Sequence, residues 1–260
     1  MENKVVVITG GTKGVGLALS EEFKKKNTVI VLSRRIIEDG KTAFACDVGN
    51  AERVKEVFDK IGAIYGNIDL LINNAGFGLS GATEFISDDA VDKLIKTNFY
   101  GVLNCVKYAL PYMKKGSKII NVSSASALLP MPFRTLYSAT KAGVMSLSDG
   151  LRLELYGTGI EVTCLCLGDV QTDFAEHRTI VKTTDARYGE RIEKCDAFVS
   201  ARGKEKKIPL EKVVKLCVKI ADKKKTKPMY LTGLKYKMLR LFYTLSPRAL
   251  QLKIINKIFG

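Results

Sequence analysis

Histidine is almost absent from this sequence of 260 residues, because His177 is the only one. A serine hydrolase needs a histidine or an equivalent base beside its nucleophile, and one isolated histidine does not by itself indicate such a site. The six cysteines lack the spacing of metal ligands, so we expect reduced thiols, a cytoplasmic location and no metal centre. No stretch of eighteen apolar residues occurs, and residues 1–4 lead directly into an apolar segment. We therefore expect neither a membrane span nor a signal peptide.

Acidic residues are scarce towards the end of the chain. The formal net charge is +15, and residues 201–260 hold 17 lysines and arginines against 3 aspartates and glutamates. The rest of the chain is nearly balanced, so the excess of positive charge bears on partners rather than on the fold. This basic region has no recognised nucleic-acid-binding motif and no series of stacking aromatic residues. We therefore do not expect nucleic acid as a partner.

The body of the chain alternates between strand patterns and helix patterns. Buried strands are predicted at seven short apolar runs, residues 4–9, 28–33, 42–46, 68–72, 119–122, 160–165 and 228–231. This alternation predicts an α/β fold, with a doubly wound parallel sheet of about seven strands and helices on both faces. Only thirteen residues separate Ser33 from Asp47, so the crossover helix there is expected to be absent or very short. A long helical region is expected at about 88–113.

A glycine-rich turn follows the first predicted strand, with Gly10, Gly14 and Gly16 spaced as G-x-x-x-G-x-G. Glycine permits a tight turn and a close approach of the backbone to a pyrophosphate at a helix N-terminus. Such a turn is compatible with a purely structural role, but its place after the first strand favours nucleotide binding. The second strand ends at Ser33 and Arg34, where an NAD-binding fold would carry an acidic residue. An arginine suits a 2′-phosphate, and Lys13 adds a second cation, so NADP(H) is the predicted cofactor.

The segment from Ser124 to Lys141 carries the residues that point to chemistry. Ser124 stands at the end of a predicted strand, and Tyr137 and Lys141 are four residues apart in a predicted helix. Residues at that spacing share one helix face. A nearby ammonium favours the phenolate and is expected to lower the pKa of Tyr137 towards neutrality. With a serine hydroxyl to hold a substrate oxygen, this is the pattern of a proton donor beside an oxygen clamp.

Together these motifs resemble the short-chain dehydrogenase/reductase family over residues 4–232. The matching positions are Thr9-Gly10-x-x-x-Gly14-x-Gly16, Asp47-Val48, Asn73-Asn74-Ala75-Gly76, Asn98, Ser124, Tyr137-x-x-x-Lys141 and Gly168-x-Val170-x-Thr172. The resemblance implies a single Rossmann-type domain that binds a nicotinamide dinucleotide and interconverts carbonyls and alcohols. It also implies a homodimer or homotetramer. The chain departs from the family pattern at Leu167, where proline is usual, and at Ala127, where glycine is frequent.

The resemblance also implies a role for each matching residue. In the catalytic set, Tyr137 is the general acid, Lys141 lowers its pKa and holds the nicotinamide ribose, Ser124 binds the substrate oxygen, and Asn98 kinks its helix and holds a water of the proton relay. The residues implied to bind the cofactor are Gly10, Thr12, Lys13, Gly14, Val15, Gly16, Ser33, Arg34, Asp47, Val48, Asn74, Ala75, Gly76, Tyr137, Lys141, Val170 and Thr172.

An apolar loop, Ala127–Phe133, and Phe174 are candidates for the walls of a substrate pocket. The segment from Leu128 to Lys141 and the turn at residues 167–174 look most like those of family members acting on steroids, retinoids or other lipids. The expected function is NADPH-dependent reduction of a lipophilic ketone such as a steroid, bile acid or other lipid, or the reverse reaction. One alternative is a 3-oxoacyl reductase acting on a carrier-protein or CoA substrate, which basic residues of the segment 173–208 would suit. Another is a cofactor-binding regulator or scaffold without turnover.

The chain is expected to divide into a catalytic domain, residues 1–232, and a basic helical tail, residues 233–260. Within the first part, the polar and irregular segment 173–208 is a candidate substrate lid. The tail is expected to form two amphipathic helices, the second beginning at Ser246-Pro247. Their apolar stripes comprise Met238, Leu241, Phe242 and Leu245, then Leu250, Ile254, Ile255, Ile258 and Phe259. Two interpretations remain open, contact with an anionic membrane and packing against protein.

Overall fold

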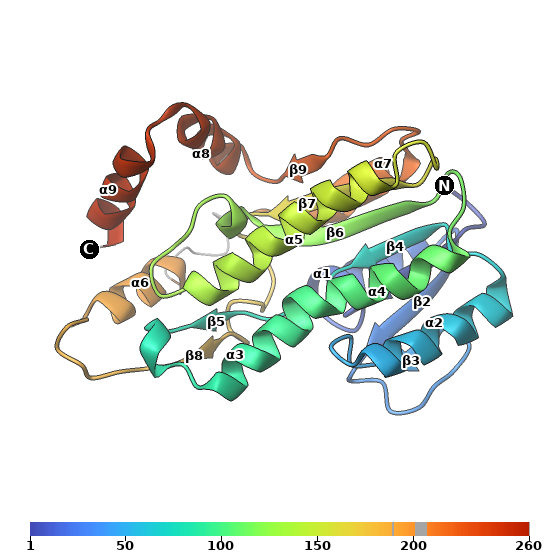
Figure 1. Ribbon diagram of the computed structural model, residues 1–260, viewed down its shortest axis with the longest axis horizontal. Helices are drawn as coiled ribbons and strands as arrows, with labels where there is room; N and C mark the ends of the chain where they lie inside the picture. The colour runs from blue at the N-terminus through green and yellow to red at the C-terminus, as the bar shows by residue number, and fades with distance from the viewer. Residues whose placement is uncertain (189, 201–206, 260) are drawn as a thin grey trace.

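All seven predicted strands form, and they lie side by side in one sheet. The computed structural model describes residues 1–188, 190–200 and 207–259. The strand order is β3-β2-β1-β4-β6-β7-β9, and every neighbouring pair is parallel. This confirms the predicted doubly wound sheet (Figure 1). The strands are β1 (Val5–Thr9), β2 (Thr28–Ser33), β3 (Ala43–Ala45), β4 (Leu70–Asn73), β6 (Lys118–Ser124), β7 (Glu161–Leu167) and β9 (Met229–Leu231).

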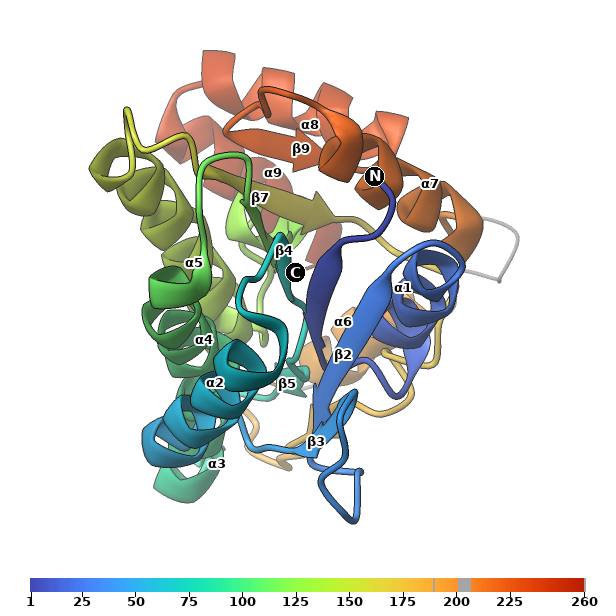
Figure 2. The same ribbon diagram turned by 90° about the vertical axis from the view of Figure 1, so that its right-hand side faces the viewer.

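Helices cover both faces of this sheet, as Figure 2 shows. On one face, α2 (Ala51–Tyr65), α4 (Gly101–Ala109) and α5 (Thr135–Glu154) pack on the strands through buried residues such as Phe58, Cys105 and Val144. On the other, α1 (Gly14–Lys24) and α7 (Leu210–Asp222) do so through Leu19 and Ile220 among others. The strands are buried on both faces, which explains why their sequences are continuous apolar runs rather than alternating ones.

No helix forms between β2 and β3, as predicted from the short spacing. The connecting loop is instead fastened to α2 by side chains of that helix, among them Arg53 and Tyr65, whose hydroxyl donates to the Lys41 carbonyl oxygen at 2.8 Å. The Arg53 guanidinium pairs with the Asp39 carboxylate, at 2.5 Å, and donates a hydrogen bond to the Ala45 carbonyl oxygen at 2.9 Å. The absence of a crossover helix leaves the end of β2 accessible, where Arg34 and Arg35 are exposed.

The helical region predicted at about 88–113 forms, but it is not one regular α-helix, because two α-helices are joined by a wider turn. α3 (Asp88–Ile95) passes into a π-helical turn, η2 (Lys96–Tyr100), and then into α4. The turn contains Asn98, whose side chain exchanges two hydrogen bonds of 3.0 Å with the backbone of Phe77. π-helical turns within α-helices often occur at functional sites, and this one places Asn98 beneath the cavity.

The segment 173–208 is more ordered than the irregular lid that we predicted. It contains a short strand, β8 (Thr179–Ile180), and a helix, α6 (Arg191–Ser200). β8 pairs in parallel with β5 (Leu79–Ser80), a two-residue strand after β4 that the sequence did not reveal. Each strand has only two residues, which is too short for a periodic pattern to appear. Residues 189 and 201–206 of this predicted lid lie outside the described part of the chain.

The tail forms the two predicted helices, α8 (Leu234–Leu245) and α9 (Arg248–Phe259). Gly233, with a φ of 82°, turns the chain from β9 into α8. The Gln251 amide donates to the carbonyl oxygens of Tyr243 and Ser246, which fastens α9 to the end of α8. Both helices lie beyond the carboxyl ends of the strands, with α9 beside α6 (Figure 1). Throughout the residues described, no helix is both long and apolar enough to cross a membrane.

Candidate active site

A cavity of about 730 Å³ opens at the carboxyl ends of β1, β4, β6 and β7. Open α/β sheets bind ligands at this edge, where the strand order reverses. Every residue that we predicted for catalysis or cofactor binding lines this cavity, except Gly16 and Asn98. Those two are buried directly behind it. The structure therefore brings together residues that are spread over more than 160 positions of the sequence, from Gly10 to Thr172.

The glycine turn forms one end of the cavity. Gly10 and Gly14 have positive φ angles of 67° and 53°, which residues other than glycine rarely adopt. A Cβ on Gly16 would lie 2.3 Å from the Gly10 carbonyl oxygen, so only glycine lets α1 begin so close to the turn. The Thr9 hydroxyl accepts hydrogen bonds from the backbone N–H groups of Asn74 and Ala75, each at 3.0 Å. These contacts join β1 to β4 and leave a cradle of backbone at the helix N-terminus, which fits a pyrophosphate.

Three cations gather beside this turn at the end of β2. Lys13, Arg34 and Arg35 all line the cavity. Burial lowers the pKa of Lys13, and the charges of Arg35 and Arg34 lower it further. Arg34 also lies 3.7 Å from the Asp47 carboxylate, while the Thr12 and Ser33 hydroxyls are hydrogen-bonded at 2.9 Å. An anionic ligand would relieve the repulsion among the three cations. Arg35 was not among our predicted site residues, although its place after Arg34 was a signal.

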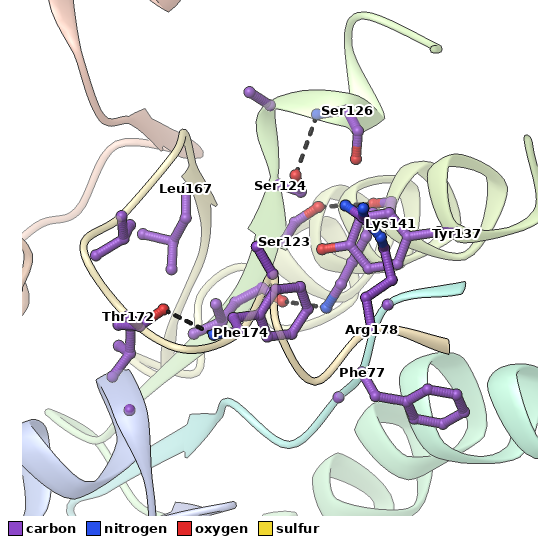
Figure 3. Close-up of a pocket in the computed structure, with 18 of the residues that line it drawn as sticks. Phe77, Ser123, Ser124, Ser126, Tyr137, Lys141, Leu167, Thr172, Phe174 and Arg178 are labelled. Atoms are coloured by element: carbon purple, nitrogen blue, oxygen red, sulfur yellow. Dashed lines mark hydrogen bonds between the residues drawn. The ribbon is translucent and has the colours of Figure 1, made fainter. Parts of the chain in front are cut away.

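Tyr137 and Lys141 project from the first turns of α5 towards Ser124 at the end of β6 (Figure 3). The Lys141 ammonium donates to the Val122 carbonyl oxygen at 3.1 Å and lies 5.9 Å from the centre of the Tyr137 ring. The Ser123 hydroxyl donates to the Lys141 carbonyl oxygen at 2.8 Å, which anchors α5 to β6. Opposite, the ring of Phe174 lies 6.2 Å from that of Tyr137. A phenol, an ammonium and a serine hydroxyl thus meet in one enclosed corner.

The pKa of Tyr137 differs from our expectation. We predicted that Lys141 would lower it, whereas burial raises the pKa of Tyr137 to about 12, and the hydrogen bond with Ser124 offsets only part of this. Burial also lowers the pKa of Lys141 to about 8. Both shifts have the same cause, since an enclosed site disfavours the charged form of each group. A phenol with this pKa keeps its proton at neutral pH, as a general acid must.

Asn98 supports this corner from behind. It is fully buried in η2, and besides its two bonds to Phe77 it reaches the Thr140 hydroxyl at 3.4 Å. A Cβ on Gly76 would lie 3.1 Å from the Asn98 carboxamide oxygen and 3.4 Å from the Lys141 ammonium nitrogen. Gly76 therefore lies close to both the Asn98 carboxamide and the Lys141 ammonium, and a side chain at this position would crowd both groups. Asn98 is held by the loop that follows β4, through Phe77, and Lys141 is held by β6, through Val122.

Apolar residues form the walls of the cavity beyond Tyr137. The predicted loop contributes Leu129, Pro130 and Met131, and Phe174 also lines the cavity as predicted. The tail contributes a wall that we did not predict. Its Tyr236 ring packs on Gly168, where an added Cβ would lie only 2.3 Å from a ring carbon. The residues of the tail that line the cavity are Lys235, Tyr236, Leu239, Phe242, Tyr243, Ile254 and Ile255.

Within the described ranges, no group of three or more histidine, cysteine, aspartate or glutamate residues could hold a metal ion. His177 lies at the exposed rim, where its Nδ1 contacts the Asp173 carbonyl oxygen at 2.8 Å. Cys164 and Cys166 are buried behind the site with their sulfurs 3.8 Å apart, and both thiols are free.

Comparison with known proteins identifies the family. The sequence pattern of the short chain dehydrogenases matches residues 4–182, so the chain belongs to the short-chain dehydrogenase/reductase family of oxidoreductases, which confirms the resemblance. It is 34% identical over 204 residues to the 3-ketodihydrosphingosine reductase of Bacteroides thetaiotaomicron, covering 76% of this chain and 74% of that relative. It is 32% identical over 206 residues to an 11-beta-hydroxysteroid dehydrogenase of Pinus massoniana, covering 73% of this chain and 58% of that relative.

The solved structures agree with this assignment. A short-chain dehydrogenase from Streptomyces avermitilis superposes on the chain with a TM-score of 0.83 at 26% sequence identity. The superposition covers 97% of this chain and 96% of that one, and it therefore includes the region of the tail.

Proposed function

We propose that the protein is an NADPH-dependent reductase that converts a ketone on a lipophilic substrate, such as a steroid or another lipid, to a secondary alcohol. One observation carries the proposal: a single cavity joins the glycine turn at one end to Ser124, Tyr137 and Lys141, and continues between apolar walls. Two relatives are named for a ketosphingoid base and for a steroid, which supports a lipophilic substrate. The same site would catalyse the reverse oxidation.

The residues of the corner have distinct roles in this proposal. A nicotinamide dinucleotide supplies or accepts the hydride when it is bound. The Ser124 hydroxyl donates to the substrate carbonyl oxygen, and the Tyr137 phenol, protonated at neutral pH, transfers its proton to that oxygen. Lys141 stabilises the phenolate that remains and holds the ribose. Asn98, fixed by Phe77, positions the neighbouring backbone and holds a water through which the proton is replaced.

The preference for NADPH rests on the cations at the end of β2. Lys13, Arg34 and Arg35 line the adenine end of the cavity, and Ser33 occupies the place where a carboxylate would repel a phosphate. Guanidinium groups bind phosphate through charge-assisted, often bidentate hydrogen bonds. The other predicted cofactor contacts along the cavity, from the glycine turn through Val48, Asn74 and Gly76 to Val170 and Thr172, belong to the same proposal.

The two alternatives predict different behaviour. A 3-oxoacyl reductase would prefer a substrate on a carrier protein or CoA, and a regulator or scaffold would bind NADPH without consuming it. The test is NADPH consumption by the purified protein with 3-ketodihydrosphingosine, a steroid ketone and a 3-oxoacyl-CoA. Consumption with the first or second supports the proposal, and a marked preference for the third would replace it by the first alternative. NADPH binding with no consumption on an extended ketone panel would favour the regulator.

We also propose that the tail, residues 233–260, brings this site to the surface of an anionic membrane. Along α8, Leu234, Met238, Leu241 and Leu245 form one stripe, with between 62% and 76% of each side chain exposed. No acidic residue follows Asp222 in the sequence, so the tail itself carries basic side chains and no acidic ones. A basic amphipathic helix of this kind lies in the interface of an anionic bilayer. A contact between two copies of the tail would instead bring like charges together.

The division into a catalytic domain, residues 1–232, and a tail stays a prediction, as does a homodimer or homotetramer. The side chains of Ile258 and Phe259, which we assigned to the apolar stripe of α9, lie outside the described residues. We propose a cytoplasmic location with peripheral membrane contact. This location would account both for the exposed apolar stripe of the basic tail and for a lipophilic substrate.

A further inference from the structure

The ring of Tyr236, in the first turn of α8, occupies the space that a side chain at position 168 would need. A Cβ on Gly168 would lie 2.3 Å and 2.5 Å from two carbons of that ring. Gly168 has no positive φ angle, so its backbone conformation does not itself require glycine. The absence of a side chain at Gly168 is therefore explained by a contact with the tail.

The position of the Tyr236 ring is set by the central sheet. The ring packs against a small core cluster that includes Cys166 of β7 and Leu231 of β9. Gly233 turns the chain into α8 with its positive φ, and a Cβ on Gly233 would lie 3.1 Å from a carbon of the same ring. A ring held between a core cluster and a backbone turn has few alternative positions, so it can act as a fixed support for the backbone that it contacts.

The 168–172 segment, which begins at this contact, runs along the cavity from the corner around Ser124 to the glycine turn. Just before it, Leu167 pairs in register with Ser124. At its end, Thr172 lies against the glycine turn, since a Cβ on Gly14 would be 3.9 Å from Thr172 Cβ. Figure 3 shows Leu167 and Thr172 at the two ends of this loop. A dinucleotide that reaches from the glycine turn to the catalytic phenol would therefore pass along this segment.

The middle of the 168–172 segment is fastened to Ile208, which lies just before α7. The Ile208 N–H donates to the Asp169 carbonyl oxygen at 2.7 Å, and the Gln171 N–H donates to the Ile208 carbonyl oxygen at 2.9 Å. These bonds form a parallel β-bridge between Val170 and Ile208. They fix the middle of the segment, whereas its first residue is held by different contacts.

The end of β9 and the start of α8 hold the first residues of the segment. The Gly168 N–H donates to the Thr232 hydroxyl oxygen at 2.8 Å, and the Asp169 N–H donates to the Tyr236 hydroxyl oxygen at 3.4 Å. The second distance is long for a hydrogen bond, so the contact of the ring with Gly168 contributes more than the hydroxyl. A ring packed on a glycine also excludes the alternative backbone conformations that glycine otherwise allows.

We propose that Tyr236 is a positioning residue for the cofactor, which fixes the 168–172 segment where it binds the nicotinamide half of the dinucleotide. Tyr236 acts through Gly168 and the segment that follows. The inference rests on the proposed function for the identity of the cofactor. A displacement of about 1 Å in a group that orients reactants can cost about a hundredfold in rate. The tail is then part of the cofactor site, besides forming a wall of the cavity.

The first measurement is hydrogen exchange of the protein without dinucleotide, which involves no reaction. The backbone N–H groups of residues 168–172 should exchange about tenfold or more faster in Tyr236→Ala, because opening the segment no longer breaks its contact with the ring. Tyr236→Phe keeps that contact and should exchange nearly as the wild type does. Met238→Ala, on the outer face of α8 and 65% exposed, is the matched control and should leave the exchange of the segment unchanged.

The second measurement separates the two halves of the cofactor by calorimetry. NADPH extends over the whole site, whereas adenosine 2′,5′-bisphosphate carries only the adenine end. Tyr236→Ala should bind NADPH about tenfold more weakly, because ordering the loosened segment now opposes binding. It should bind the bisphosphate as tightly as the wild type does, since the cations at the end of β2 are not displaced. If Tyr236→Ala does not fold, Tyr236→Leu, which keeps apolar bulk without the ring, replaces it in both measurements.

A second substitution tests the contact itself. Gly168→Ala adds the Cβ that would collide with the Tyr236 ring, and it should also weaken NADPH binding. Tyr236→Ala removes the ring, so in that background Gly168→Ala should cost much less affinity. Residues in direct contact show such non-additive effects, whereas independent residues do not. Additive losses of NADPH affinity would therefore contradict a role of Tyr236 through Gly168.

Equal losses of affinity for NADPH and for the bisphosphate in Tyr236→Ala would overturn the inference, because they would indicate a general loss of structure. Unchanged exchange at residues 168–172 in that variant would also overturn it, as would NADPH that gives this segment no protection in the wild type. The reductase proposal fails by a different result, namely NADPH binding without consumption of any ketone. That result would count against the reaction and not against the positioning of the segment.

Discussion

The Lys141 ammonium donates a hydrogen bond to the backbone carbonyl oxygen of Val122 at 3.1 Å, and this contact fixes the cation at the carboxyl end of β6. The same nitrogen lies 5.9 Å from the centre of the Tyr137 ring, so the cation is near the phenol and is held by the sheet. Because β6 is a central strand, the position of this charge depends on the core rather than on a surface loop. The electrostatics of the corner are therefore part of the fold.

The first prediction concerns the stability that Lys141 controls. Burial lowers its pKa in the folded protein to about 8, against 10.5 for the unperturbed group. Between these two pH values the unfolded chain binds more protons than the folded protein, so the free energy of unfolding should rise with pH across this window. The contribution is on the order of 3 kcal/mol. Urea unfolding at several pH values, with no dinucleotide added, measures it.

Lys141→Met should lack that part of the rise, and the difference between the two proteins cancels what all other groups contribute. Lys215→Met, at an exposed position of α7, is the matched control and should follow the wild type. Identical pH profiles for wild type and Lys141→Met would show that burial does not disfavour the charged form of Lys141.

The second prediction concerns the proton donor. Tyr137→Phe removes the phenol hydroxyl and keeps the ring that packs near Phe174. A general acid contributes about a hundredfold or more, so kcat should fall by at least that factor while NADPH binding is retained. Because burial raises the pKa of Tyr137 to about 12, the wild-type rate of reduction should show no loss from phenol deprotonation near neutral pH. If Tyr137→Phe keeps most of the activity, Tyr137 is not the general acid.

The third prediction concerns the choice of dinucleotide. Arg34→Ala combined with Ser33→Asp removes one guanidinium and places a carboxylate at the end of β2. The preference for NADPH over NADH should fall by about tenfold or more, since hydrogen bonds to charged groups contribute about 1.5–3 kcal/mol and Arg34 is half exposed. The ratio of kcat/KM for the two cofactors measures the change. If the wild-type protein had equal kcat/KM values with NADPH and NADH, the assignment of NADPH as the preferred cofactor would be contradicted before any substitution is made.

Arg35→Ala is the informative companion to that experiment. Arg35 was missing from our predicted site residues, yet its charge is the largest neighbouring influence on Lys13 after burial. If the three cations act together on the 2′-phosphate, this substitution should also weaken NADPH binding and leave NADH binding nearly unchanged. A loss of affinity for both cofactors alike would instead assign Arg35 to the shared part of the dinucleotide.

Much of the fold was predictable because its signals are local. The apolar runs of the buried strands, the glycine turn after β1 and the four-residue spacing of Tyr137 and Lys141 are each contained in a short window. Their meeting in one cavity followed from the rule that ligands bind at the carboxyl ends of parallel strands. The predicted site residues near these motifs line the cavity in the structure.

What could not be predicted depends on contacts between distant segments. The sequence did not show that Tyr236 would pack on Gly168, or that the inner face of α8 would complete the wall of the cavity. The pKa of Tyr137 was misjudged because spacing reveals a neighbouring charge, whereas burial emerges only when the loop, Phe174 and α5 are assembled. Likewise, the resemblance implied a kink at Asn98 but not its form, because the π-helical turn involves a backbone partner, Phe77, that lies 21 residues away.

The last prediction concerns the outer stripe of α8. Met238→Gln together with Leu241→Gln replaces two side chains that are 65% and 62% exposed, on the side of the helix away from the cavity wall formed by Tyr236 and Leu239. The wild-type protein should co-sediment with phosphatidylserine vesicles, less at high salt, and not with pure phosphatidylcholine vesicles, because charge and apolar insertion act together. The double variant should lose this binding and keep its activity on a soluble ketone. Leu153→Gln, at a 77% exposed position of α5, is the matched control and should bind as the wild type does. Wild-type protein that stays in the supernatant with anionic vesicles, and an oligomer that dissociates in the double variant, would assign the stripe to protein packing instead.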